Sequence, residues 1–70
     1  LDGTIRDNIT LAGPDIDDED FERILDQADL RFFLDRAPKG IHTPLVEGGR
    51  NLPAGIRKRI ALARALVTNG

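Results

Sequence analysis

The sequence contains no cysteine, methionine, tryptophan or tyrosine, and His42 is its one histidine. Without cysteine the chain forms neither a disulfide nor a thiolate metal site, and a single histidine cannot build a metal site alone. The absence of cysteine also fits a reducing compartment. Long apolar runs are missing as well, so no stretch approaches the length that crosses a membrane. The sequence therefore excludes a disulfide scaffold and a thiolate zinc site.

Charge is distributed unevenly along the chain, although the net charge is only −2. Residues 15–29 are strongly acidic and include a single basic residue, Arg23, whereas residues 50–64 are basic and contain no acidic residue. We interpret the two stretches as solvated helix faces that attract each other within the fold. A nucleic-acid interface is the less favoured alternative, because the basic stretch has no aromatic side chains on which bases stack.

Residues 51–66, NLPAGIRKRIALARAL, form the stretch around which the chain is organised. The apolar residues that recur there at helical spacing are Ile56, Ile60, Ala63 and Val67, and Leu62 and Leu66 widen the stripe. Pro53 suits the first helical position, which would place Asn51 or Leu52 near the cap. Such a helix start presents free backbone N–H groups and a partial positive charge, which favour an anion such as a phosphate.

The beginning of the chain predicts a turn followed by a short helix. Thr4 is a plausible N-cap, and Asp7 three residues later completes a capping-box pattern. The residues expected to face a core are Ile5, Ile9 and Leu11. Gly13 and Pro14 are expected to end this segment.

Residues 15–29 predict the clearest amphipathic helix. Asp17 is the expected cap, and acidic side chains fill the first turn, where they complement the positive end of the helix dipole. The expected core positions of this helix are Phe21, Ile24, Leu25 and Ala28.

A shorter helix is expected at residues 30–36, ended by Pro38 and Gly40. Its apolar face consists of Leu30, Phe33 and Leu34. Phe32 either joins the core or stays partly exposed. The following residues 41–50 predict a loop, because Pro44 and two adjacent glycines do not fit a regular helix. Within this loop Gly48-Gly49-Arg50 lacks the Gly-Lys-Ser/Thr ending of a P-loop.

The helix at residues 59–66 resembles the basic, alanine-rich helix that follows the signature motif of ATP-binding cassette (ABC) ATPases. That motif reads Leu-Ser-Gly-Gly-Gln, and Leu52 and Gly55 match it. The departures are Pro53 for Ser, Ala54 for Gly and Ile56 for Gln. The signature of this chain is therefore degenerate.

Two further stretches resemble the exporters of this family. The family pattern Phe-x-Gly-Thr-Ile-x-x-Asn-Ile, which lies just after the Q-loop, is matched by Gly3, Thr4, Ile5, Asn8 and Ile9, while Leu1 takes the place of the aromatic residue. The pattern Thr-x-x-Gly-Glu-x-Gly, which lies just before the signature, is matched by Thr43, Glu47 and Gly49, while Val46 replaces its first Gly. In the family, the second loop lies against the transmembrane domains and helps to transmit motion.

By this resemblance, residues 1–70 are the helical subdomain of an ABC nucleotide-binding domain of the exporter or type I secretion kind. The resemblance implies an all-α fragment of three to four helices, with a long loop before the last helix, cut from a larger α/β P-loop ATPase domain. The expected ATP-contacting residues are Asn51, Leu52, Pro53, Ala54, Gly55 and Ile56. The expected coupling residues are Thr43, Glu47 and Gly49.

The implied partners are a second nucleotide-binding domain, which holds the ATP in trans, and the transmembrane domains of a transporter. The fragment is expected to lie at the cytoplasmic face of the membrane, to ligate no Mg²⁺ and to have no catalytic activity of its own. Its degenerate signature implies a weakened ATP site. Two alternatives stay open from the sequence, a small helical protein-interaction module and a nucleic-acid-binding module.

Overall fold

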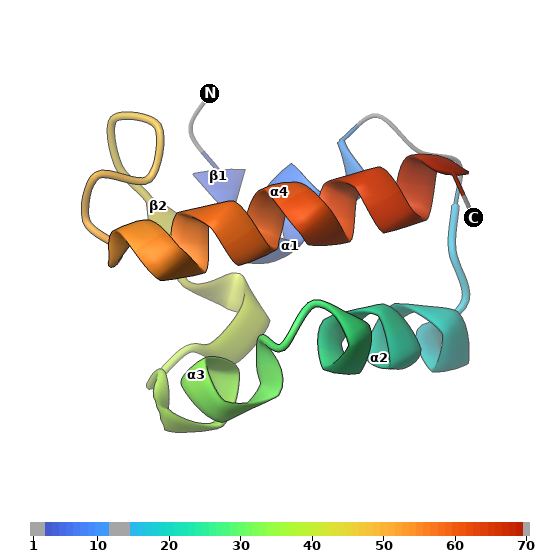
Figure 1. The fold of residues 1–70 in the computed structure, drawn as a ribbon. Helices are drawn as coiled ribbons and strands as arrows, with labels where there is room; N and C mark the ends of the chain where they lie inside the picture. Colours follow the sequence, from blue (N-terminus) through green and yellow to red (C-terminus); the bar gives the residue numbers. More distant parts are fainter. Residues whose placement is uncertain (1–2, 12–14, 70) are drawn as a thin grey trace.

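The computed structural model describes residues 3–11 and 15–69. The elements in chain order are β1 (Gly3–Thr4), α1 (Ile5–Thr10), α2 (Asp18–Gln27), α3 (Arg31–Arg36), a 3-10 turn (Gly40–His42), β2 (Pro44–Leu45) and α4 (Ala54–Asn69). In Figure 1, α4 runs along one side of the molecule, with α1 behind it and with α2 and α3 beneath it. The predicted helical bundle with a long loop before its last helix is confirmed.

The hydrophobic core lies where α4 packs against α1 and α2. The buried apolar residues are Ile5, Ile9, Phe21, Ile24, Leu25, Ala28, Leu30, Leu34, Leu45, Leu52, Ile56, Ile60, Ala63 and Val67. In α2 and α4 these are the positions that the helical spacing predicts, because residues three and four apart share one face of a helix. The longest helix, α4, therefore forms one wall of the core along its whole length.

Two leucines that were expected to contribute to apolar faces are exposed instead. Leu11 is 56% exposed and Leu62 is 47% exposed. Each lies two residues after a buried isoleucine, Ile9 or Ile60. At 3.6 residues per turn, that step rotates the side chain by roughly 200°, to the opposite side of the helix. Leu66, which was predicted to widen the apolar stripe of α4, is partly buried against the core.

A small antiparallel pair of strands joins the start of the chain to the loop before α4. Gly3 of β1 pairs with Leu45 of β2, and Thr4 pairs with Pro44. The Ile5 N–H extends the pairing by donating to the Thr43 carbonyl at 3.0 Å. This pairing was not expected from the sequence, and it ties the loop before α4 to the start of α1.

The capping box of α1 is confirmed. The Asp7 N–H donates to Thr4 Oγ1 at 3.1 Å, and the Thr4 N–H donates to Asp7 Oδ2 at 3.0 Å. Hydrogen bonds from the backbone and then from the side chain of Thr4 lower the pKa of Asp7. The expected stop at Gly13 and Pro14 lies outside the described residues, and α1 ends at Thr10.

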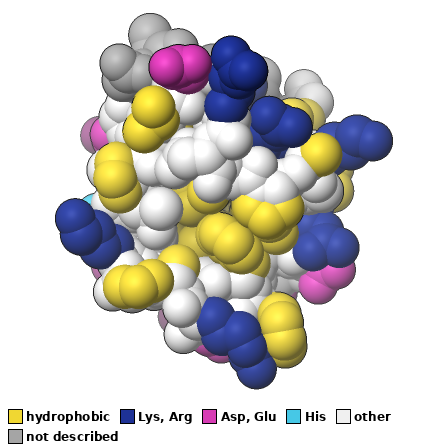
Figure 2. All heavy atoms as spheres, turned by 90° about the vertical axis from the view of Figure 1, so that its left-hand side faces the viewer, with side chains coloured by type: hydrophobic (Ala, Val, Ile, Leu, Met, Phe, Trp, Pro, Cys, Tyr) yellow, Lys and Arg dark blue, Asp and Glu magenta, His cyan; other side chains and the backbone are white. Residues whose placement is uncertain are grey.

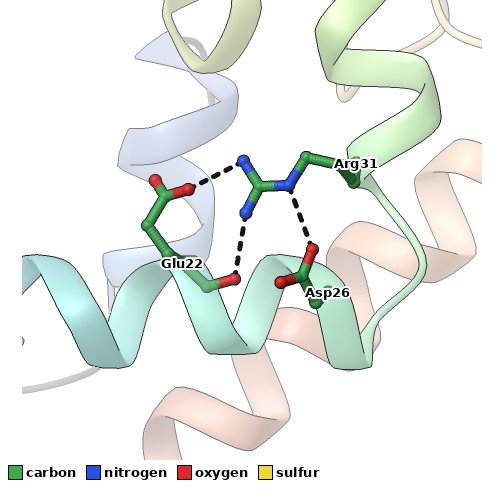
Figure 3. Close-up of polar contacts among 3 residues, drawn as sticks. All are labelled: Glu22, Asp26 and Arg31. Atoms are coloured by element: carbon green, nitrogen blue, oxygen red, sulfur yellow. Dashed lines mark hydrogen bonds and ion pairs between the residues drawn. The ribbon is translucent and has the colours of Figure 1, made fainter.

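The junction between α2 and α3 is held by Arg31 (Figure 3). Its guanidinium contacts Glu22 Oε1 at 2.7 Å and Asp26 Oδ1 at 3.0 Å, and it donates to the Glu22 carbonyl at 3.1 Å. The hydrogen bond to Asp26 is the main cause that raises the pKa of Arg31. Between the two helices Asp29 adopts a positive φ of 59°, a conformation that Asp tolerates better than most residues.

The N-cap of α2 is Asp17, as predicted, because the Asp20 N–H donates to Asp17 Oδ1 at 2.8 Å.

One ion pair joins the acidic stretch to the basic stretch among the described residues, as the charge pattern indicates. Arg59 of α4 lies 3.5 Å from Asp29, which lies in the turn between α2 and α3. Both side chains are substantially exposed, so the pair contributes little to stability.

Within residues 3–11 and 15–69, no helix combines the length and the apolar character that a membrane crossing demands.

Candidate functional site

The start of α4 separates the six predicted ATP-contacting residues into two groups. The side chains of Leu52 and Ile56 are buried in the core, each only 7% exposed. Pro53, Ala54 and Gly55 are consecutive and exposed. The exposed group forms the surface of the first turn, whereas the side chain of Ile56 faces the core.

The first turn of α4 begins one residue later than expected. The Pro53 carbonyl accepts hydrogen bonds from the N–H groups of Ile56 at 3.0 Å and of Arg57 at 3.1 Å. A residue whose carbonyl starts the helical ladder occupies the N-cap, so Pro53 is the cap rather than the first helical residue. Proline is tolerated there because its missing N–H is not needed by the helix.

The amides of Ala54 and Gly55 are the exposed donors of this turn. No carbonyl or side chain among the described residues accepts a hydrogen bond from either amide. A Cβ added at Gly55 would meet nothing within 4 Å, so the space in front of this residue is open. Two unpaired N–H groups at the positive end of a 16-residue helix suit a phosphate oxygen.

Asn51 braces the loop before α4 instead of capping the helix. Its Oδ1 accepts from the Val46 N–H at 3.0 Å, and its Nδ2 donates to the Pro44 carbonyl at 3.0 Å. Both ends of the side-chain amide are therefore engaged within the protein. The Leu52 N–H donates to the Gly49 carbonyl at 2.9 Å and fixes the last residues before the helix.

The three predicted coupling residues lie in this same braced loop. Thr43 Oγ1 donates to the Gly40 carbonyl at 2.6 Å and closes the 3-10 turn. Glu47 has a positive φ of 50°, and the adjacent Gly48 and Gly49 also have positive φ. Glu47 contacts Arg50 at 3.5 Å, and both side chains are largely exposed. The carboxylate is thus displayed on a loop whose backbone is held in place.

The basic side chains of α4 are partly engaged within the fold. Arg64 Nε donates to the Asn8 carbonyl at 2.8 Å, and Arg59 pairs with Asp29. Arg57 lies along the buried Gly49, where an added Cβ would come within 3.5 Å of its side chain. These internal contacts do not favour the interpretation of α4 as a nucleic-acid-reading helix.

The first turn fits a phosphate better than it fits a metal ion. The exposed amides of Ala54 and Gly55 are donors, whereas Mg²⁺ requires oxygen ligands, usually carboxylates. No group of three potential metal-ligating side chains occurs within the described part of the chain. Two features reduce the capacity of the turn for phosphate, because Pro53 has no N–H and the Ala54 methyl occupies space that a glycine would leave free.

Comparison with known proteins gives consistent relatives. The chain is 41% identical over 67 residues to the mycobactin import ATP-binding/permease protein of Mycolicibacterium thermoresistibile, covering 96% of this chain and 12% of that protein. It is 39% identical over 64 residues to the glutathione/L-cysteine transport system ATP-binding/permease protein of Escherichia coli, covering 91% and 11%. It is 40% identical over 80 aligned positions to the ABC multidrug transporter atrC of Emericella nidulans, covering 93% and 6%. No protein-family model matches the chain.

The chain belongs to the ABC transporters. It spans about a tenth of the length of the ABC relatives named first. The matches cover nearly all of the chain, so the resemblance does not rest on the helix after the signature alone. The start of the chain, the braced loop and α4 all lie within the matched length of an ABC protein.

Sequence reasoning about this ABC segment missed two features of the site. One is the bracing role of Asn51, which depends on a hydrogen bond to Pro44, seven residues earlier. The other is the strand pair that attaches the loop to the start of α1. The strand pair joins Gly3 to Leu45, which lie far apart in the chain, whereas the Asn51 contacts are made within an irregular loop that has no periodic pattern. The one local signal was Asn51 itself, because an asparagine side chain readily bonds nearby backbone.

Proposed function

We propose that this chain is the helical subdomain of the ATP-binding part of an ABC transporter, at the cytoplasmic face of the membrane. In this proposal the first turn of α4 contacts ATP that is held by a partner nucleotide-binding domain. The observation that carries the proposal is the pair of exposed amides of Ala54 and Gly55 at the positive end of α4. Such fixed dipoles stabilise phosphate charge without reorganising.

The chain supplies binding groups and no catalytic machinery. It has no Gly-Lys-Ser/Thr sequence to hold a β-phosphate. The partner domain therefore provides the P-loop, the Mg²⁺ ligands and the catalytic carboxylate, and this chain provides the opposing wall of the site. Closure of the two domains around ATP is then the step that links nucleotide binding to movement.

The loop with Thr43, Glu47 and Gly49 would pass that movement to the transmembrane domains. Its support is structural, because the loop is braced by Asn51 and by the β1–β2 pair and leads directly into the first turn of α4. Glu47 is its exposed charge. The sequence contains no cysteine, so Glu47→Cys would place a unique thiol in this segment. Cross-links from that thiol to transmembrane-domain loops would support the coupling role, and cross-links confined to the ATP-binding domains would contradict it.

The site is proposed to be a weak one. Each phosphate hydrogen bond that Pro53 fails to provide, because it has neither an N–H nor a hydroxyl, costs about 1–3 kcal/mol, since the acceptor is charged. The Ala54 methyl hinders the close approach that a glycine would allow. The test restores the exposed positions in the full transporter with Pro53→Ser and Ala54→Gly. Ile56 is left unchanged, because its side chain is buried and a glutamine there would place an amide in the core.

The restored transporter should hydrolyse ATP about tenfold faster or more, which corresponds to about 1.4 kcal/mol of recovered interaction. Ala61→Gly is the matched control, because it introduces a glycine at an exposed position of α4 beyond the first turn. It weakens the helix by about 1 kcal/mol without adding a phosphate donor. Equal rates in the restored and original transporters would contradict the proposal.

A further inference from the structure

A small pocket with a volume of about 60 Å³ lies between α1, the loop before α4 and the first turns of α4. The charged and amide side chains in its lining are those of Asn8 from α1 and of Arg57 and Arg64 from α4. The backbone of residues 48–49 closes it from the side of the loop. We call it the arginine pocket.

The arginine pocket is separate from the surface that is proposed to meet ATP. Of the predicted ATP-contacting residues, Leu52 belongs to its lining, through a side chain that is 7% exposed. The exposed residues 53–55 of the first turn of α4 are outside the lining. Gly49 is shared with the predicted coupling residues, whereas Glu47 is not part of the lining and contacts Arg50 instead. Binding in this pocket therefore needs neither ATP nor a second nucleotide-binding domain.

The two arginines of the pocket have no carboxylate partner among the described residues. Arg57 and Arg64 are seven residues apart, which places them on the same side of α4 and roughly 10 Å apart along its axis. None of the described residues that line the pocket is an aspartate or a glutamate. By contrast, a carboxylate lies beside each of Arg23, Arg31, Arg50 and Arg59. Two positive charges without a counter-charge in one recess favour an anion.

Hydrogen-bond donors are left over on both arginines and on the loop. Arg64 Nε donates to the Asn8 carbonyl at 2.8 Å, which orients the guanidinium and leaves its terminal N–H groups without an acceptor among the described residues. The Arg57 guanidinium has no acceptor there either, and its aliphatic stem lies along Gly49. The Gly48 N–H also finds no acceptor in the described part of the chain. Guanidinium groups and free backbone amides are the donors that bind carboxylate and phosphate oxygens.

The surroundings and the size of the pocket narrow the choice of anion. Figure 2 shows Lys and Arg side chains spread over the face that holds the loop and the start of α4, with few Asp or Glu side chains among them. This face is therefore basic, although the net charge of the chain is −2. One water molecule needs about 10–15 Å³ of a recess, so 60 Å³ holds about four or five non-hydrogen atoms. That is the size of a phosphate ion or a carboxylate group, and it is too small for a whole nucleotide.

We propose that the arginine pocket binds one small oxyanion, which accepts hydrogen bonds from Arg57, Arg64 and the Gly48 amide. The anion joins the loop to α4, and Arg64 extends the connection to α1 through the Asn8 carbonyl. Two sources offer this chemistry, a free phosphate ion and a carboxylate side chain from elsewhere in the transporter. The second source rests on the proposed function, in which these 70 residues are part of a longer protein.

The test is a nuclear magnetic resonance titration of the ¹⁵N-labelled 70-residue chain with sodium phosphate at constant ionic strength. Sodium acetate is the second probe. Sodium chloride is the control, because a chloride ion does not match the forked donors of a guanidinium. We expect saturable shifts of the Nε–H signals of Arg57 and Arg64 and of the Gly48 amide. The dissociation constant for phosphate should be about 1–10 mM, and chloride should bind at least about tenfold more weakly.

Substitutions at Gly48 separate the pocket from unspecific attraction between charges. A Cβ added at Gly48 would meet nothing within 4 Å, and aspartate and asparagine both tolerate its positive φ of 74°. Gly48→Asp offers the arginines an internal carboxylate and should weaken phosphate binding at least about tenfold. Gly48→Asn has the same shape without the charge and should weaken it less than about threefold.

A second pair of variants tests the arginines. Arg57→Gln should weaken phosphate binding about tenfold, because it removes one of the two guanidinium groups from the pocket. The matched control is Lys58→Gln, which removes the neighbouring positive charge from outside the lining and should weaken binding less than about twofold.

Thermal unfolding of the full transporter distinguishes the two sources of the oxyanion. A rise in unfolding temperature with phosphate that is lost in Arg57→Gln identifies a free anion. A lower unfolding temperature of Arg57→Gln without phosphate, combined with no response of the original transporter to phosphate, identifies an internal carboxylate that occupies the pocket.

Four outcomes would overturn the proposal. The first is the absence of saturable shifts at Gly48 up to about 100 mM phosphate, ten times the expected upper limit. The second is a set of shifts centred on the amides of Ala54 and Gly55, which the proposed nucleotide contact alone would produce. The third is an equal loss of binding in Arg57→Gln and Lys58→Gln, and the fourth is a full transporter that responds neither to phosphate nor to Arg57→Gln. A failure of the nucleotide contact would leave phosphate binding in the arginine pocket unchanged.

Discussion

Removal of the Asn51 side chain tests how the loop before α4 is held. Asn51→Ala deletes two hydrogen bonds, one from the Val46 N–H and one to the Pro44 carbonyl, each 3.0 Å long. A typical intramolecular hydrogen bond contributes about 0.5–1.5 kcal/mol net. Because both groups regain water when the bond is lost at this exposed position, we expect the lower half of that range from each bond. The free energy of unfolding should therefore fall by about 1–2 kcal/mol.

The assay is urea unfolding of the 70-residue chain, followed by far-ultraviolet circular dichroism, together with hydrogen exchange of single amides. The Val46 amide should lose protection in Asn51→Ala, whereas amides in the middle of α4 should lose protection only through the lower global stability. Asn69→Ala is the control, an exposed asparagine at the end of α4, and it should change stability by less than about 0.5 kcal/mol. An unchanged Val46 exchange rate would refute the bracing role.

Three further predictions use the same unfolding assay. Phe21→Ala should lower the free energy of unfolding by about 3–5 kcal/mol because the ring is 1% exposed, whereas Phe32→Ala, at 66% exposure, should lower it by less than about 1 kcal/mol; similar losses would contradict the described core. Arg31→Lys should lower the free energy of unfolding by about 1 kcal/mol, because an ammonium group cannot reproduce the forked contacts with Glu22 and Asp26. Arg23→Lys, at an exposed arginine with one partner, should lower it by less than about 0.5 kcal/mol. The pKa of Asp7 is lower in the folded chain than its ordinary value of 3.8, so its carboxylate stabilises the fold fully above that pH, and this contribution is lost as the pH falls through the lower folded pKa. The stability difference between the original chain and Asp7→Asn should therefore shrink below about pH 4, and a difference that grows with acidity would contradict the capping contact.

The helices were predictable because their signals are local. The apolar spacing that starts at Phe21 identifies α2, and the spacing that starts at Ile56 identifies α4. The caps at Thr4 and Asp17 were also predictable, since a capping side chain bonds an amide only a few residues away. Leu62 shows the limit of this reasoning, because a leucine outside the apolar face adds to the hydrophobicity of the helix without being buried.

The strand pair was not predictable from local sequence. Each strand has two residues, and β1 is separated from β2 by most of the chain. Strand formation depends on the partner strand more than on intrinsic preference, so two residues carry no usable pattern. Pro44 even argues against a strand, and it is accepted here because a two-stranded sheet has only edges.

The resemblance singles out the candidate site, but the exposure of its residues was not predictable from the sequence. The resemblance located the turn around Pro53, yet the sequence could not say which neighbours would face solvent. The structure buries the side chain of Ile56 and engages the amide of Asn51 in the loop. The exposed surface of the turn is therefore reduced to Pro53, Ala54 and Gly55. Tertiary burial of Ile56 and the loop hydrogen bonds of Asn51 determine which residues of the turn are exposed, and the local sequence pattern predicts neither.

The most direct test of the account places a negative charge in the first turn of α4. In the full transporter, Ala54→Asp sets a carboxylate beside the amides that are proposed to meet the phosphates of ATP. An acidic residue in the first turn favours the helix by about 0.3–1 kcal/mol, so loss of folding would not explain a loss of function. Ala61→Asp, at an exposed position further along α4, is the control for added charge.

The measurement is the rate of ATP hydrolysis by the three transporters, with thermal unfolding of each to confirm that the fold is retained. The account predicts that Ala54→Asp lowers the rate at least tenfold while Ala61→Asp leaves it within about twofold of the original. A rate for Ala54→Asp equal to that of the original transporter would show that the start of α4 does not contact the nucleotide.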